Sequence, residues 1–421
     1  MELKRVVVTG LGAITPLGND VETTWNNAVN GVSGAGPITH FDASQFKTQF
    51  ACEVKDFNPE LYFDRKKARA LDLYAQYAMA AAQQAIDDSG LEQDEKLNKD
   101  RVGVIIAAGI GGLHTFEEEA GNYALNKEKG PKYSPFFIPK MIADIASGHV
   151  SMQYGYHGPN FGVVSACASS NNAIIDAFNL IRLGKADAIV TGGAEAAVYP
   201  AGVGGFNAMH ALSTRNDDPQ GASRPFSKSR DGFVIGEGSV VLILEELEHA
   251  LARGAKIYGE IAGGGVSADA YHITATHPEG LGAKLAMRNA LEDAGMKPED
   301  IDYINTHGTS TPVGDVSEVK AIMDVFGDHA YKVNIDSTKS MTGHLLGATG
   351  AMEAMFCIKA VQNDIVPPTI NHDPEDKDEN IDYNLNFTFG KAQERTVNAA
   401  LSNSFGFGGH NATVIVKKYR P

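Results

Sequence analysis

Residues 161–167 read Phe-Gly-Val-Val-Ser-Ala-Cys, an apolar run that ends in small residues, and an apolar helical period follows over 173–183. The same order returns at 333–339, Val-Asn-Ile-Asp-Ser-Thr-Lys, before a helical period over 350–360. A strand that passes through a small-residue turn into a helix is the building unit of α/β proteins. Because this unit occurs twice, the sequence predicts two similar α/β halves.

Two further stretches support this duplication. Residues 6–12, Val-Val-Val-Thr-Gly-Leu-Gly, and residues 258–264, Tyr-Gly-Glu-Ile-Ala-Gly-Gly, each run from a strand into glycines. A cut near residue 255 places one of these stretches at the start of each half. We therefore expect an N-terminal half over 1–255 and a C-terminal half over 256–421 that share one core.

Apolar runs and helical periods give the remaining elements. Strands are expected at 5–9, 102–107, 161–164, 188–191, 240–245, 257–262, 301–306, 332–336 and 397–401. The clearest helices are expected at 65–89, 172–183, 285–294 and 350–361. Strands that alternate with helices predict a largely parallel sheet with helices packed against it.

Composition excludes several classes of protein. The 421 residues carry 36 basic and 52 acidic side chains, and the net charge of -16 opposes binding to nucleic acid or to anionic membranes. No apolar run approaches the ~18 residues of a membrane-spanning helix, and the first ten residues lack the apolar core of a signal peptide. Three cysteines are too few for a disulfide framework. We expect a cytoplasmic protein with free thiols.

Cofactor motifs are incomplete. Gly10 and Gly12 supply two glycines of a dinucleotide fingerprint, but Thr15 stands where the third glycine belongs. His272 and His277 are five residues apart and would not share a helical face, so they do not form a zinc motif. The sequence therefore predicts neither a nucleotide cofactor nor a bound metal.

Cys167 lies between the predicted strand at 161–164 and the predicted helix at 172–183. At such a turn, unpaired N–H groups and the positive end of the helix dipole favour the thiolate over the thiol. The small neighbours would let an electrophile reach the sulfur, and the same N–H groups could bind an oxyanion. These features leave open both a nucleophile and a small buried cysteine. Cys52 and Cys357 are expected to be structural.

Two histidines follow predicted strands and stand among Gly, Ser and Thr, namely His307 and His344. Loops at the carboxyl ends of parallel strands are where α/β proteins bind ligands, although either residue could simply be a turn residue. A papain-like hydrolase would use one histidine as a base, but the residues around Cys167 lack the signature of that family. Two neutral imidazoles that donate to one oxygen would instead stabilise an enolate.

Several long motifs occur in order along the chain. They are Val-Ser-Ala-Cys-Ala-Ser-Ser at 164–170, Asn-Thr-His-Gly-Thr-Ser-Thr-Pro-Val-Gly-Asp at 305–315, Lys-Ser-Met-Thr-Gly-His-Leu-Leu-Gly-Ala-Thr-Gly at 339–350, and Asn-Ser-Phe-Gly-Phe-Gly-Gly at 403–409. Shorter matches are Leu-Ser-Thr-Arg-Asn-Asp at 212–217, Arg-Asp-Gly-Phe-Val at 230–234 and Gly-Glu-Gly at 236–238. Over essentially its whole length the chain resembles the β-ketoacyl-[acyl-carrier-protein] synthases, the elongating condensing enzymes of fatty acid synthesis.

This resemblance implies the thiolase-like fold, a duplicated αβαβα five-layered sandwich, and a homodimer. It implies that Cys167 takes the acyl chain from carrier-protein phosphopantetheine as a thioester, without a cofactor of its own. Malonyl carrier protein would then lose carbon dioxide, and its enolate would attack that thioester in a Claisen condensation. His307 and His344 would hold the malonyl thioester oxygen, while the backbone N–H groups of Cys167 and Phe407 would hold the oxyanion.

Further roles come from the same resemblance. Lys339 would orient the histidine region electrostatically, with Glu353 in the same network. Thr309 and Thr311 would form hydrogen bonds with the pantetheine arm. Phe405 and Phe407 resemble an aromatic gate, a glycine-flanked loop that opens when the acyl chain enters.

Chain-length preference and partner binding are also implied by resemblance. Ile110 matches the residue that lines the acyl pocket in type II synthases, whereas type I synthases have a smaller residue there. Lys66 and Arg69 match positions that meet the acidic acyl carrier protein. His210 departs from the family pattern, because an arginine commonly stands there, so this part of the carrier contact could be weaker or pH-dependent.

Three alternatives share parts of this pattern. A polyketide or specialised-lipid ketosynthase would carry out the same chemistry on another chain. A non-catalytic chain-length partner usually lacks the nucleophile, and the presence of Cys167 with both histidines argues against it. A thiolase that uses coenzyme A would carry a C-terminal cysteine motif where this chain has residues 405–409.

Overall fold

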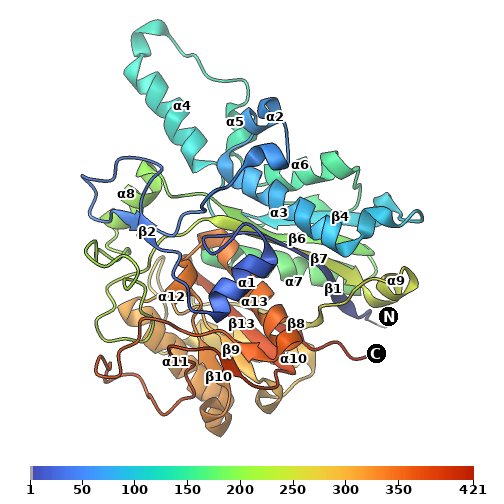
Figure 1. Cartoon of the computed structure of the whole chain (residues 1–421), viewed down its shortest axis with the longest axis vertical. Coiled ribbons are helices and arrows are strands. Elements are labelled where there is room, and N and C mark those ends of the chain that lie inside the picture. Colours follow the sequence, from blue (N-terminus) through green and yellow to red (C-terminus); the bar gives the residue numbers. More distant parts are fainter. Residues whose placement is uncertain (1–2) are drawn as a thin grey trace.

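The computed structural model describes residues 3–421 (Figure 1). Ten strands form one mixed sheet in the order β10-β9-β13-β14-β8-β1-β7-β6-β4-β5. One set of five comprises β1 (Val6–Ile14), β4 (Val102–Ala107), β5 (Asn160–Phe161), β6 (Ala188–Glu195) and β7 (Gly238–Glu246). The other comprises β8 (Gly259–Ala268), β9 (Tyr303–Asn305), β10 (Asn334–Asp336), β13 (Ala399–Gly406) and β14 (His410–Lys417).

The two sets of strands have the same topology. From either outer edge inward, the strands follow one another as the third, second, fourth, fifth and first of their set. The parallel pairs β4·β5 and β4·β6 have counterparts in β9·β10 and β9·β13, and the remaining pairs in each set are antiparallel. The first strands, β1 and β8, pair antiparallel at the centre. This repeat confirms the duplicated α/β fold, whereas the boundary at residue 255 stays a prediction.

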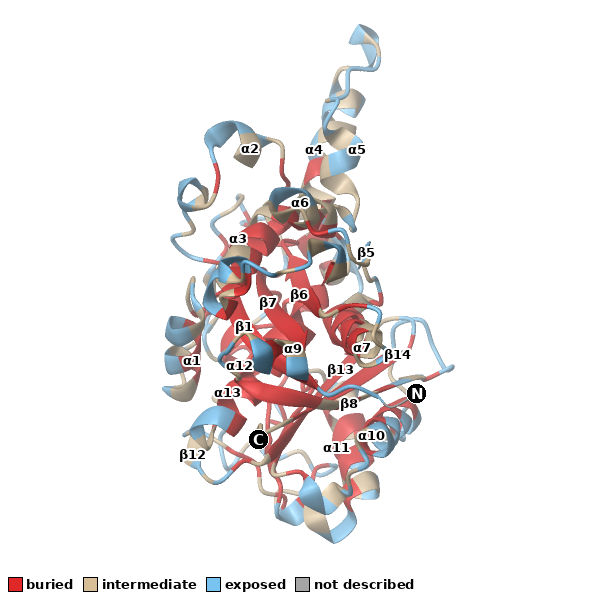
Figure 2. Cartoon of the chain, turned by 90° about the vertical axis from the view of Figure 1, so that its right-hand side faces the viewer, coloured by how far each residue is buried: buried red, intermediate tan, exposed pale blue. Residues whose placement is uncertain are grey.

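The molecule has five layers, because the two sets of strands form two of them and helices form the other three. The helix α3 (Leu73–Ser89) covers β1 and β7, and α10 (Leu281–Ala294) covers β8 and β14 on the opposite outer face. Between them lie α7 (Ser169–Arg182) and α13 (Thr349–Asn363), which share one apolar core with strands of both sets. Figure 2 shows these central elements as the most buried part of the chain. The helix α13 is buried on all sides from Thr349 to Val361, as a helix between two sheet faces must be.

Shorter elements connect these layers. The remaining helices are α1 (Val21–Val29), α2 (Arg65–Arg69), α4 (Leu113–Leu125), α5 (Phe137–Met141), α6 (Ile145–Tyr154), α8 (Pro200–Ala208), α9 (Leu247–Ala252), α11 (Pro312–Phe326) and α12 (Lys339–Thr342). The remaining strands are β2 (Gly36–Pro37), β3 (Phe50–Ala51), β11 (Ile365–Val366) and β12 (Gln393–Glu394). The pair α4 and α5 projects as an arm from the body in both views (Figures 1 and 2). Within residues 3–421, no helix has the length and apolar character needed to cross a membrane.

Several expected elements begin or end at other residues in the structure, and two differ by more than their ends. The single helix expected at 65–89 is wrong, because the chain forms α2 and α3 with a break before Leu73. Asp72 produces this break, since its carboxylate accepts the N–H of Tyr74 and both the N–H and the hydroxyl of Thr115. A strand was expected at 161–164. The observed strand, β5, covers only Asn160–Phe161, after which the chain leaves the sheet.

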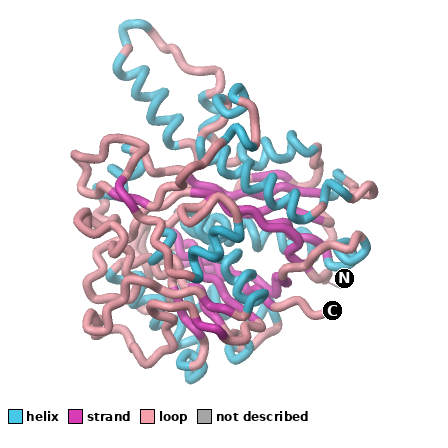
Figure 3. Tube along the Cα trace, viewed as in Figure 1, coloured by secondary structure: helices cyan, strands magenta, loops and turns pink. Residues whose placement is uncertain are grey.

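Loops gather along one side of the molecule (Figure 3). Isolated bridges join them, since Cys52 pairs with Gly236 and Ser227 pairs with Lys377. Another bridge joins Ile235 to His344. The loop-rich side is therefore where segments distant in sequence meet one of the two candidate histidines.

Candidate active site

Cys167 is the middle residue of a 3-10 turn, Ala166–Ala168, that leads directly into α7. The turn begins with Ala166 at φ +51°, a backbone conformation that is uncommon for a residue with a side chain. The backbone N–H groups of Cys167 and Phe407 both lie near the sulfur. This arrangement supplies two N–H donors beside a single thiol, as an oxyanion site requires.

The surroundings determine the resting state of this thiol. Cys167 keeps a small exposed surface, but burial raises its pKa to about 12. Lys339 and the N–H groups of Phe407 and Cys167 lower the pKa, as predicted from the turn, yet they do not outweigh burial. The thiol is therefore the resting form, and not the thiolate that we expected from the turn alone. Cys52 and Cys357 are fully buried.

The two histidines lie together. His307 follows β9, and His344 lies between α12 and the 3-10 turn Leu346–Ala348, with ring centroids 5.3 Å apart and planes at 87°. Burial lowers the pKa of each well below its usual value, and Lys339 lowers both further. For His307, the neighbouring His344 adds to this effect. Both rings are therefore neutral near pH 7.

Hydrogen bonds orient the ring of His344. Its Nδ1 lies 2.9 Å from the hydroxyl of Thr349, the first residue of α13, and its backbone N–H donates to the carbonyl of Val234 at 2.7 Å. When the Thr349 hydroxyl donates to Nδ1, the proton of the neutral ring is on Nε2, which is then a donor. Sequence reasoning missed Thr349. The only signal was a hydroxyl five residues after the histidine, at the start of a predicted helix.

The backbone at His307 is held by a carboxylate. Glu318 of α11 accepts the N–H groups of His307 and Gly308, each at 2.8 Å, and also the side-chain amide of Asn403. The ring packs against Phe405 with centroids 5.6 Å apart. Its Nδ1 is buried and has no hydrogen-bond partner within residues 3–421. The ring is thus fixed by its backbone and by packing, with a free polar atom.

Lys339 is almost completely buried and forms an ion pair with Glu353 of α13. Burial raises the pKa of Glu353 to about 8, while Lys339 lowers it. The ammonium group of Lys339 influences Cys167, His307 and His344 alike. The charge of one buried lysine therefore lowers the pKa of all three residues that the sequence singled out, namely Cys167, His307 and His344.

The hairpin turn between β13 and β14 lies over Cys167. A Cβ on Gly406 would be 2.9 Å from the backbone nitrogen of Cys167, so this approach requires glycine. Gly408 and Gly409 have φ of +89° and +74°, which glycine adopts without strain. Phe407 packs on Phe206 with centroids 6.4 Å apart. The turn thus needs glycine on both sides of Phe407, at Gly406 for the close approach and at Gly408 for its backbone angle.

The other predicted residues lie in three separate parts of the fold. Thr309 and Thr311 share the loop that follows His307, and their hydroxyl oxygens are 3.1 Å apart. Ile110 lies in the loop between β4 and α4 and is 39% exposed. Lys66 and Arg69 lie on the exposed helix α2, which Figures 1 and 2 both show away from α12.

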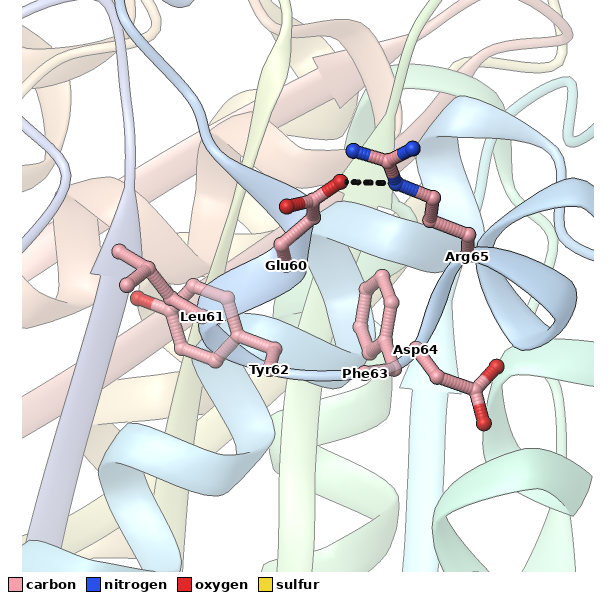
Figure 4. A pocket seen from close by; sticks show the side chains of 6 residues that line it. All are labelled: Glu60, Leu61, Tyr62, Phe63, Asp64 and Arg65. Carbon is pink, nitrogen blue, oxygen red and sulfur yellow. Dashed lines mark hydrogen bonds and ion pairs between the residues drawn. The ribbon is translucent and has the colours of Figure 1, made fainter.

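A surface pocket next to α2 contains none of the predicted chemical residues. Its lining consists of the side chains of residues 60–65, and Arg65 pairs there with Glu60 (Figure 4). Within residues 3–421, no three His, Cys, Asp or Glu side chains are grouped so that they could hold a metal ion. The chemistry is therefore concentrated at Cys167 and the histidine pair.

Sequence reasoning also missed Glu195, the last residue of β6. Its buried carboxylate accepts backbone N–H groups from the loop at Gly109–Gly111 and from Gly347. The expected strand at 188–191 ended before this residue. An acidic side chain that follows two glycines and an alanine was the only signal in the sequence.

Comparisons with known proteins give matches over most of the chain. Residues 3–250 match the family described as beta-ketoacyl synthase, N-terminal domain, and residues 258–373 match its C-terminal domain. A relative from Synechocystis sp., named 3-oxoacyl-[acyl-carrier-protein] synthase 2, is 52% identical over 421 residues, covering 100% of this chain and 99% of the relative.

Solved structures are similar over nearly the whole chain. The ishigamide ketosynthase/chain length factor has a TM-score of 0.91 at 35% identity and covers 99% of this chain and 100% of that chain. A type II PKS acyl-carrier protein in complex with its ketosynthase bound to the hexaketide gives a TM-score of 0.89 at 33% identity, with the same coverage.

Proposed function

This chain belongs to the β-ketoacyl synthase family, and from that membership we propose that it elongates fatty acyl chains by decarboxylative Claisen condensation. The substrates are an acyl primer and malonyl groups, both carried by acyl carrier protein, and the product is a 3-oxoacyl carrier protein. The curated relative from Synechocystis sp. bears the name of this activity at 52% identity, above the 35% of the polyketide-related structure. The fatty acid assignment is therefore preferred over a polyketide ketosynthase.

The first half-reaction transfers the acyl group to Cys167. Its sulfur, after loss of the thiol proton, attacks the carbonyl carbon of the acyl thioester. The C–S bond to pantetheine then breaks, and the pantetheine sulfur takes up a proton. The N–H groups of Cys167 and Phe407 would stabilise the oxyanion that forms on the carbonyl oxygen.

The second half-reaction takes place beside the histidine pair. The bond between the malonyl carboxylate and its neighbouring carbon breaks, carbon dioxide leaves, and the electron pair forms an enolate. Neutral His307 and His344 would donate N–H bonds to the enolate oxygen, which carries more charge in the transition state than in the substrate. The enolate carbon attacks the Cys167 thioester, and the Cys167 sulfur leaves and is protonated again.

One observation carries this proposal, namely that the charge of one buried lysine, Lys339, acts both on a thiol with two backbone N–H donors and on two neutral, buried imidazoles. The direct test supplies the purified protein with an acyl carrier protein primer and malonyl carrier protein. We expect release of carbon dioxide and a product that is two carbons longer, detected by mass spectrometry. Hydrolysis of the primer without elongation would contradict the proposal. A catalytically silent partner subunit would give neither result.

The pH dependence follows from the lowered pKa of the histidines. Because His307 and His344 stay neutral well below pH 6.5, decarboxylation of malonyl carrier protein should show no single-proton loss centred near pH 6.5, whereas Glu353, with a pKa of about 8, titrates above that pH. Below pH 6.5 these two histidines bind more protons in the unfolded chain than in the folded chain, so their own contribution to stability decreases there. Circular dichroism should therefore accompany the rates. A single-proton decline centred near pH 6.5 in folded protein would contradict this prediction.

Carrier protein docking is proposed for α2. Lys66 and Arg69 are exposed, and neither side chain has a hydrogen-bond or ion-pair partner in the part of the chain between residues 3 and 421. Arg65 and Lys67, by contrast, bond to Glu60 and Gln153. Two free cations on one short helix suit an acidic partner, and a carrier protein complex is known for a ketosynthase of the same fold.

Charge reversal tests this docking surface. The double variant Lys66→Glu/Arg69→Glu should raise the KM for acyl carrier protein about tenfold and leave kcat nearly unchanged, because rim charges act mainly on association. The matched control, Lys96→Glu/Lys297→Glu, changes the same charge at two other exposed positions. Equal KM values for the two double variants would remove the docking proposal.

Assembly and location complete the proposal. Large apolar side chains are exposed on or near the α4–α5 arm and the outer strand β5, namely Ile110, Phe116, Phe136, Ile138 and Phe161. A second copy would cover them, so the enzyme is proposed to be a homodimer with Ile110 lining a type II acyl pocket near the interface.

No resident cofactor is required, since pantetheine arrives with the substrate. Three free cysteines suit the reducing cytoplasm, and the halves 1–255 and 256–421 stay as proposed.

A further inference from the structure

Glu195 is a buried carboxylate to which the reaction above gives no role. Its Oε2 accepts the N–H of Gly109 at 2.7 Å and that of Gly347 at 3.0 Å. Its Oε1 accepts the N–H of Ile110 at 3.1 Å and that of Gly111 at 3.2 Å. The donors are 84 to 152 residues away along the chain. Four backbone donors from two distant loops therefore converge on one side chain.

One of the two loops lies next to the turn that carries Cys167, and the other follows His344. The loop of Gly109 lies against the cysteine turn, since a Cβ on Gly109 would be 3.3 Å from the carbonyl oxygen of Ala166. Gly347 lies three residues after His344. A Cβ on Gly347 would be 2.1 Å from the backbone nitrogen of Gly109, so the two loops touch. Glu195 accepts hydrogen bonds from both loops at this contact.

The repeat in the fold gives this position a counterpart. Glu195 ends β6, and Gly406 ends β13, the equivalent fourth strand of the other set. Gly406 lies against the turn that carries Cys167, whereas Glu195 binds the turn that carries Gly347. Both strands lie in the buried centre of the molecule (Figure 2). Each strand end therefore holds the turn of the other half.

We propose that Glu195 is a positioning residue. It fixes the turn Ala166–Ala168, which carries Cys167, relative to the turn Leu346–Ala348, which follows His344, so that the enolate meets the Cys167 thioester. The inference rests on the proposed condensation. Acyl transfer needs only the cysteine side, and decarboxylation needs only the histidine side. Condensation needs both sides in register. Loosening the contact therefore lowers condensation much more than either half-reaction.

The substitution Glu195→Gln tests this role. Its amide nitrogen would face two N–H donors, so two of the four acceptor contacts are lost. We expect condensation to fall by about 30-fold, since misplacement by 1 Å costs up to about 10²-fold. Carbon dioxide release from malonyl carrier protein should stay within about threefold of the parent enzyme. Acylation of Cys167, followed by intact-protein mass, should not decrease, because loss of the Glu195 charge lowers the pKa of the thiol. Glu195→Asp keeps two acceptor oxygens and should lose less condensation.

A matched variant separates positioning from stability. Glu53 is a buried carboxylate that accepts the N–H groups of Thr39 and His40, and Glu53→Gln should leave all three activities within about twofold. Parallel loss of all three activities in Glu195→Gln, with a matching decrease in Tm, would overturn the inference. So would unchanged condensation. Should Glu195→Gln not fold, the same selective loss in Glu195→Asp decides. If the parent enzyme does not condense, the proposed function fails instead.

Discussion

Replacing Cys167 with alanine is expected to abolish condensation while decarboxylation of malonyl carrier protein continues. The thioester cannot form without the sulfur, so elongation should fall on the order of 10⁴-fold or more, to the background of the assay. The enolate site does not include the sulfur. His307 and His344 stay neutral and buried without it, because burial is the main cause of their lowered pKa.

The measurement compares two products in one reaction. Carbon dioxide release reports the histidine side, and mass spectrometry of the carrier protein reports chain extension. Cys357→Ala is the matched control, because it removes a thiol from a buried helical position outside the site. It should keep elongation within about threefold of the parent enzyme at a slightly lower Tm. Elongation that persists in Cys167→Ala would remove the nucleophile assignment.

Replacing either histidine with alanine should have the opposite pattern. His307→Ala and His344→Ala each remove one N–H donor from the enolate oxygen, which typically costs about 10²–10³-fold in rate. Decarboxylation and condensation should both fall by that factor. Acyl transfer to Cys167 depends on the N–H groups of Cys167 and Phe407, so it should stay within about tenfold of the parent rate.

The control for these variants is His157→Ala. His157 is an exposed residue in the turn between α6 and β5, so its removal should change no activity by more than about twofold. Acylation is followed by intact-protein mass, and decarboxylation by carbon dioxide release. An equal loss of acyl transfer and decarboxylation in His307→Ala or His344→Ala would contradict the division of roles between the two sides.

Sequence patterns predicted the parts of the fold that local chemistry determines. The strand at 102–107 and the helices α7 and α13 match because apolar spacing within one element is enough to define them. The turn at Cys167 was visible for the same reason, since small residues separate a strand from a helix. The glycine-rich settings of His307 and His344 also lie within single loops.

The missed features depend on contacts between distant residues. Asp72 caps α3 locally through the N–H of Tyr74, but its bonds to Thr115, 43 residues away, are not visible in any local pattern. The strand β14 was not predicted, because it includes polar Asn411 and Thr413, which are buried and bonded to Asp269 and Asn403. Such pairing becomes visible only when the strands are assembled.

The pKa of Cys167 shows a second limit of sequence reasoning. The turn supplies N–H groups that lower the pKa, and their presence could be predicted. Burial raises the pKa by more, and the extent of burial depends on how segments distant in sequence pack around the thiol. The sign of the net shift is therefore a property of the folded site. Glu195 was missed for a similar reason, since its four donors lie in other loops.

The repeated 3-10 turn has a consequence for how many reaction centres one chain can hold. Ala166 and Leu346 begin the two turns at nearly equal φ, +51° and +50°, so Gly347 occupies the place in the second turn that Cys167 has in the first. A side chain at 347 would collide with the backbone of Gly109. The two turns are therefore alike in backbone but not in what they can carry: the first has room for a thiol side chain, and the backbone of Gly109 excludes any side chain from the same place in the second.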